Sequence, residues 1–253
     1  MRTIENLGDL LKYCPNSDNI EAGLAFRGQG KFHPLVPSLF RPGHACKNYG
    51  GWSSYEKMLI RVFEREARPY LDKLPQTLFD WIALAQHHGL PTRCLDWTTS
   101  PAIALFFAAE DRDEENDGIV WAYSSNLITF KLPTTWKDIA EFRDTTLWLP
   151  SKFFDRVTNQ QGILTVHPLP EETAEFKPFE EGKETGSYPP LQRFVIPGKS
   201  KASILRQLDD IGVTHQFIYP GLDGVSRNIK WKLARLKAAH GDEQKHSISQ
   251  KLI

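Results

Sequence analysis

Apolar positions along the chain follow two spacings, one typical of helices and one typical of strands. The three-to-four-residue spacing predicts helices over 4–13, 53–71, 77–88, 101–109, 199–211 and about 224–239. Short runs rich in β-branched and aromatic residues predict strands over 23–27, 91–98, 118–125, 162–168, 193–197 and 216–220. Helices dominate early and strands late, without regular βα alternation, which favours an α+β domain over a doubly wound sheet.

Local signals place several helix ends. Ser53–Glu56 has the form of a capping box, and Gly89 suits the position just after a helix. Ser100 followed by Pro101 predicts an N-cap and a first helical turn, and Ser200 is predicted to cap the helix that follows it. The helix over 101–109 is apolar almost all round, so we expect it deep in the core.

The length of 253 residues suits one large domain with a substantial core. Lys and Arg together number 31 and balance 31 Asp and Glu, so net charge supplies no long-range attraction to nucleic acid or membrane. The basic stretch 226–240 is explained by a solvated helix face. Three cysteines without paired spacing, no secretory leader and no apolar run of bilayer length predict a cytoplasmic protein without a membrane partner.

Candidate chemistry begins at "GLAFRGQG" (23–30), where an apolar run ends in Arg27 and glycines follow at 28 and 30. Arginine offers a planar fork of donors to an anion. Glycine permits a close approach to the backbone. The stretch therefore suggests a place where an anionic ligand meets the main chain.

A second polar cluster lies in "LAQHHGLPTRCLDWTTSPAIALFFAA" (84–109), between two apolar helices. Such density marks either a site or a hydrogen-bond network that makes the junction rigid. His87 and His88 are adjacent and point in different directions, so no shared metal is expected. Arg93 and Asp96 either pair with each other or bind a ligand, and the Thr98–Ser100 triplet serves at least as a helix cap.

Five blocks occur in order: "FRGQG", "PSLFR" (37–41), the 84–109 stretch, "NQQGI" (159–163) and "IYPGLDGV" (218–225). The chain resembles the FRG domain family, named for the Phe-Arg-Gly found here at 26–28. The resemblance implies a single FRG domain over 1–253, with a core of about 20–238 and a polar tail over 239–253. A mixed or antiparallel central sheet, split around a cleft and flanked by the N-terminal helices, is expected.

The blocks also resemble, more distantly, the ADP-ribosyltransferase fold. That resemblance implies that Arg27 contacts NAD phosphate or ribose, and that the Gly28 backbone holds the nicotinamide. Trp97 or Phe32 would stack on nicotinamide. The cofactor-binding residues then expected are Arg27, Gly28, Gln29, Thr92, Arg93, Trp97, Thr98, Thr99 and Ser100. NAD would be a substrate, with ADP-ribose passed to a protein or nucleic acid, and no metal is expected.

The catalytic candidates are Arg27, His87, Asp96 and Gln161. The late strands lack the glutamate typical of such transferases, since "NQQG" offers amides instead, and Asp96 or Asp223 is left as the substitute acid. A toxin or phage-defence effector with an antitoxin or regulatory partner is one context. Two alternatives stay open: a non-catalytic nucleotide- or phosphate-binding module, and a metal-free nuclease or hydrolase with a histidine as general base.

Overall fold

The computed structural model describes residues 2–13, 23–43, 46–125, 128–129, 135–136, 143–149, 159–179 and 191–250. Its helices of seven or more residues are α1 (Leu7–Tyr13), α2 (Trp52–Ala67), α3 (Leu78–His87), α4 (Pro101–Ala109), α7 (Lys201–Asp210) and α9 (Leu222–Gln250). The short helix α8 spans His215–Ile218. The strands are β1 (Arg2–Thr3), β2 (Gly23–Gln29), β3 (Cys94–Thr98), β4 (Gly118–Ser125), β5 (Ile128–Thr129), β6 (Thr146–Trp148), β7 (Gly162–Val166) and β8 (Gln192–Ile196).

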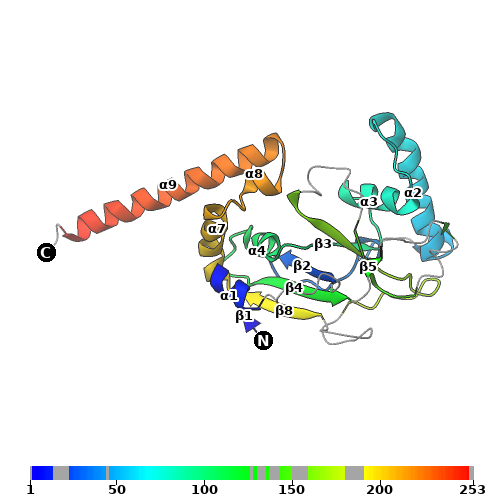
Figure 1. Ribbon diagram of the computed structural model, residues 1–253, viewed down its shortest axis with the longest axis horizontal. Helices are drawn as coiled ribbons and strands as arrows, with labels where there is room; N and C mark the ends of the chain where they lie inside the picture. The colour runs from blue at the N-terminus through cyan, green and yellow to red at the C-terminus, as the bar shows by residue number, and fades with distance from the viewer. Residues whose placement is uncertain are drawn as a thin grey trace.

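Within the described ranges, the strands form one mixed sheet in the order β1-β8-β4-β2-β3-β7-β6-β5. The pairs β1–β8 and β5–β6 are parallel, and the other neighbours are antiparallel. This arrangement confirms the predicted α+β class with a mixed, largely antiparallel sheet. Figure 1 shows α4 and α7 beside one half of the sheet, α3 and α2 at the other, and α9 running away from both.

The sheet is divided at its centre. β2 pairs with β4 along its whole length, and β3 pairs with β7 along its whole length. By contrast, β2 and β3 are joined by the single register pair Phe26↔Thr98. The two half-sheets therefore separate beyond that pair, and the cleft expected from the resemblance opens there.

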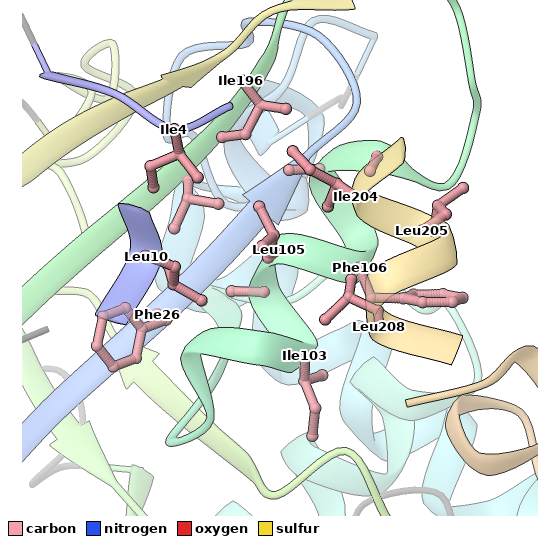
Figure 2. Packing of buried hydrophobic residues seen from close by; sticks show 14 of the residues in the cluster. Ile4, Leu10, Phe26, Ile103, Leu105, Phe106, Ile196, Ile204, Leu205 and Leu208 are labelled. Atoms are coloured by element: carbon pink, nitrogen blue, oxygen red, sulfur yellow. The ribbon is translucent and has the colours of Figure 1, made fainter. Parts of the chain in front are cut away.

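Three cores surround the divided sheet. The first lies between α4, α7 and the β2-side strands; Figure 2 shows Phe106 of α4 beside Leu205 and Leu208 of α7. The second lies between α2, α3 and the β3-side strands. The third covers the opposite face and spans both halves, from Ala25 and Trp121 to Trp97 and Leu147. Helices cover one face on each side of the division, and the third core closes the back.

Several local predictions are confirmed and others are wrong. The Ser100 side chain accepts from the Ile103 amide with Pro101 following, and Gly89 ends α3 at φ +83°. The capping box at Ser53–Glu56 is wrong, because Gly51 is the N-cap of α2 and Glu56 is buried.

Three further predictions from the C-terminal half also fail. Ser200 makes no side-chain cap, since a 3-10 turn over Gly198–Ser200 precedes α7. The predicted strand 216–220 is the helix α8, begun by the side chain of Thr214. The last helix runs to Gln250, well past 239. No helix in the described part of the chain combines the length and apolar character that a membrane span requires.

Candidate functional site

A cleft of about 320 Å³ opens where β2 and β3 separate. Its walls come from β2, the end of α3, β3, α4 and the turn before β7. Arg27 and Asp96, 69 positions apart in sequence, both line it, with Gln86 and His87 at one side and Phe107 at the other. The two polar clusters of the sequence therefore meet at one place.

Arg27 lies in the gap between the half-sheets. Its Nη1 donates to the main-chain oxygen of Asp96 at 2.5 Å, across the point where ladder pairing has stopped. Its Nε is buried and has no hydrogen-bond partner in the described part of the chain. Burial lowers the pKa of Arg27, and the nearby Asp96 charge raises it in part. Arginine stays protonated in proteins, so a partly desolvated cation with spare donors faces the cleft.

The Asp96 carboxylate is held by a relay from α3. The Gln86 amide donates to Asp96 Oδ2 at 3.0 Å, and the Thr92 hydroxyl donates to Gln86 Oε1. Because the Asp96 carboxylate can only accept, the NH₂ end of the Gln86 amide must face it, and the amide oxygen is left to accept from the Thr92 hydroxyl. Oδ1 of Asp96 has no partner among the residues that the structure describes. The relay thus orients one exposed carboxylate while leaving one oxygen available.

Helix α4 forms one wall of the cleft and explains Gly28. A Cβ at Gly28 would lie 1.9 Å from the main-chain oxygen of Ala104, so only glycine lets β2 and α4 pack this closely. Gly28 also lines the cleft, so its predicted contact with a ligand stays a prediction beside this packing against α4. The same packing brings the half-buried ring of Phe107 to the cleft.

The triplet Thr98–Ser100 begins with the last residue of β3; its side chains form local hydrogen bonds, and Thr98 also lines the cleft. Thr98 Oγ1 accepts from the Ser100 amide at 3.0 Å, and Ser100 caps α4. Thr99 Oγ1 donates to Gln161 Oε1 at 3.2 Å, which ties β3 to the turn before β7. Gln161 is exposed at φ +46°, and its neighbour Gln160 lines the cleft instead.

Arg93 does not reach the cleft. Both Arg93 and Glu56 are fully buried, and Arg93 Nε lies 2.9 and 3.0 Å from the two Glu56 oxygens, with Nη2 on Oε2 as well. The suggested Arg93–Asp96 pair is therefore wrong, because Arg93 is committed to Glu56 of α2. The pair crosslinks α2 to the start of β3, a structural role.

The aromatic residues predicted to stack on nicotinamide lie in different places. Trp97 lines the cleft, but it is only 4% exposed and its Nε1 donates to Thr165 Oγ1 at 2.8 Å, so most of the indole belongs to the third core. Phe32 is half exposed but lines a different cavity. Gln29 accepts from Trp121 Nε1 at 2.9 Å and lines a further cavity together with Arg27. The half-buried Phe107 is a more accessible ring in the wall of the cleft.

His87 lines the cleft, and the exposed His88 beside it has its ring centroid 5.1 Å away in an edge-on arrangement. Within the described ranges, no group of three or more His, Cys, Asp and Glu side chains is arranged to hold a metal ion.

Gln86, Phe107 and Gln160 are site residues that sequence reasoning did not select. Gln86 belonged to the polar cluster, and its distance of ten positions from Asp96 gave no sign of contact. Phe107 was hidden within an apolar run. Gln160 stood next to the selected Gln161, and only the turn geometry separates their directions.

Comparison with protein families identifies part of the chain. Residues 22–117 match the model of the FRG domain, so the chain carries an FRG domain. The matched segment begins just before β2, ends just before β4 and contains every cleft residue except Gln160. Neither the curated proteins nor the solved structures include a match to this chain.

Proposed function

We propose that this FRG-domain chain binds NAD in the cleft between β2 and β3 and transfers ADP-ribose to a macromolecule. The observation that carries the proposal is the meeting of Arg27 and Asp96 in the division of the sheet, with the ring of Phe107 in the wall. These supply a cation, a carboxylate and an aromatic face in one small cavity. Each has a matching part in NAD.

Arg27 is assigned to the pyrophosphate. A guanidinium forms paired, charge-assisted hydrogen bonds with phosphate oxygens, and such bonds are stronger than those between neutral groups. Nη1 of Arg27 donates to the main-chain oxygen of Asp96, while Nε and Nη2 have no acceptor in the described ranges. A phosphate placed beside these donors would satisfy a buried polar group that otherwise costs stability.

Asp96 is assigned to the reacting ribose. Transfer breaks the bond between ribose C1′ and the nicotinamide nitrogen, and the bond's electron pair leaves with neutral nicotinamide. Positive charge then develops on the ribose, and a fixed carboxylate nearby stabilises it. The acceptor's nucleophilic atom next bonds to C1′ and gives up its proton, for which His87 is the base at the cleft.

The missing late glutamate is the strongest argument for a second candidate, a nucleotide-binding module without turnover. The turn before β7 presents Gln160, whose amide donates to the main-chain oxygen of Ile218 at 3.1 Å. An amide cannot offset positive charge as a carboxylate does. The two functions therefore differ in whether Asp96 performs the missing role.

The nuclease alternative uses the same cleft, with His87 as base and Arg27 on a phosphate. It predicts RNA cleavage that His87→Ala abolishes and that needs no NAD. No contact in the cleft favours it over the transferase.

The test combines thermal unfolding with a release assay. NAD at a hundred times its Kd should raise stability by about 2.7 kcal/mol, which is roughly 5–10 °C in Tm for a chain of this size. Arg27→Ala should abolish the shift, and Asp96→Asn should keep the shift but lose nicotinamide release. Arg65→Ala, which changes an exposed arginine on α2, is the matched control.

Three results decide between the candidates. A shift without release in the wild type would establish the binding module. Release undiminished in Asp96→Asn would refute the catalytic role of Asp96. No shift in the wild type would refute NAD binding altogether.

A further inference from the structure

Three cavities follow one another along the β2 end of the sheet. The cleft shares Arg27 with a second cavity of about 710 Å³, which also reaches Lys31 and Arg41. That cavity shares Lys31 with a third, of about 490 Å³, which contains Phe32 and Arg193. Neighbouring cavities therefore share a lining residue, Arg27 for the first two and Lys31 for the last two.

From this row of cavities we propose that the adenosine half of the dinucleotide binds beyond Arg27, with its adenine stacked on Phe32. The inference rests on the proposed NAD binding, and it assigns a site to the part of the ligand that the 320 Å³ cleft leaves out. The pyrophosphate would lie at Arg27, and the adenosine phosphate would face Lys31 and Arg41.

Charge along the middle cavity favours phosphate. Lys31 is exposed and has no ion-pair partner within the described residues, and Arg41 uses only Nε, on the main-chain oxygen of Val36 at 3.2 Å. The acids nearby are already engaged. Asp111 pairs with the buried Lys201 at 2.8 Å, and Asp113 accepts from the Asn116 amide at 2.7 Å and from the Glu115 main chain. The available cations therefore outweigh the available anions there.

The third cavity presents an aromatic platform. Phe32 is 51% exposed, its ring centroid lies 6.2 Å from that of Trp121, and the Arg193 guanidinium lies 5.4 Å from its centre. Packing on Trp121 and Arg193 holds an exposed ring that would otherwise be mobile. Every nucleobase has a flat face that stacks on such a ring. Trp121 is also the register partner of Arg27, so the platform lies one strand away from the phosphate site.

Asp117 supplies a hydrogen-bond acceptor at the third cavity. Its Oδ1 accepts from the Gly198 amide at 3.0 Å, while Oδ2 has no partner among the described residues and can accept from a base. Adenine carries an amino donor at C6 that matches such an acceptor. Asp117 can therefore hold the edge of an adenine that stacks on Phe32.

Calorimetric titration of three ligands tests the assignment: NAD, ADP-ribose and nicotinamide mononucleotide. Phe32→Ala should weaken NAD and ADP-ribose by roughly 5- to 150-fold, the range for loss of one base stack. It should leave nicotinamide mononucleotide within twofold, since that ligand has no adenine. Tyr70→Ala, which removes an aromatic side chain that is 88% exposed, is the control and should change nothing. Asp117→Ala, which removes the acceptor, should weaken NAD and ADP-ribose and leave nicotinamide mononucleotide within twofold.

The outcomes separate this inference from the proposed function. NAD binding that Phe32→Ala leaves unchanged would overturn the adenine site and leave NAD binding at Arg27 intact. An equal loss for NAD and nicotinamide mononucleotide would show that Phe32 acts through the fold, which also overturns the site. Failure of the wild type to bind NAD would overturn both.

Discussion

The ion pair between Arg93 and Glu56 gives the sharpest test of how the site is supported. Both side chains are fully buried, and both Glu56 oxygens accept from Arg93. Arg93→Met would leave the Glu56 carboxylate without its cation in an apolar setting. Breaking a buried pair from one side costs about 3–5 kcal/mol, a large share of a typical total of about 5–15 kcal/mol.

The double variant isolates the cause. Removing both charges, with Glu56→Leu and Arg93→Met, leaves no unpaired charge, and replacements of this kind are often neutral or stabilising by about 1–4 kcal/mol. We therefore expect the double variant to be more stable than Arg93→Met alone. The free energy of unfolding, measured in urea, gives the coupling energy of the cycle.

The matched control is Arg65→Met, which changes an exposed arginine on the same helix as Glu56, and it should leave stability nearly unchanged. If Arg93→Met lowered the free energy of unfolding by less than about 1 kcal/mol, the reasoning would be refuted, because a desolvated carboxylate without a partner costs more than that. So would a double variant whose loss equals the sum of the two single losses.

Three further predictions concern Gly28 in the wall of the cleft, the relay that holds Asp96, and the buried His167. Gly28→Ala should lower the free energy of unfolding by about 1–3 kcal/mol, measured in urea, because its Cβ would meet the Ala104 oxygen; a stable variant would contradict the packing. Thr92→Val should cost about 0.5–1.5 kcal/mol and slow nicotinamide release more in wild type than in Gln86→Ala, where the relay is already broken. Burial first, and then the charges of Arg93 and Arg27, lower the pKa of His167 to about 3. Since the unfolded chain binds this proton from about pH 6.5 downward, stability should fall by about 2–3 kcal/mol between pH 7 and pH 4.5 on account of this group. Urea midpoints for wild type and His167→Gln at both pH values check it, and an equally steep loss in the variant would contradict it.

The sequence predicted the elements whose signals are local. Ser100 with Pro101 placed the start of α4, and the apolar content of 101–109 placed that helix in the core. Prediction from sequence failed where a contact between residues far apart in the chain determines the role of a side chain. Glu56 looked like the acid of a capping box, because its partner Arg93 lies 37 positions away.

The site divides in the same way. Arg27 and Asp96 were selected because their neighbours in sequence are distinctive, and the structure brings them into one cleft. The sequence did not predict which face of the sheet each side chain would occupy. Alternation along β3 sends Trp97 into the rear core and Asp96 toward the cleft, and no spacing rule indicates which face of the sheet is which.

The single register pair between β2 and β3 has a mechanical consequence. The half-sheets have separate cores on the helical face and share one core on the rear face. The shared rear core can therefore act as a hinge between the two half-sheets and the helices that cover them. Separating the half-sheets requires the loss of few backbone hydrogen bonds. Amides at the end of β2 should therefore exchange with solvent faster than those of β4. A ligand that contacts both half-sheets would slow that exchange, and it would make the two half-sheets unfold together.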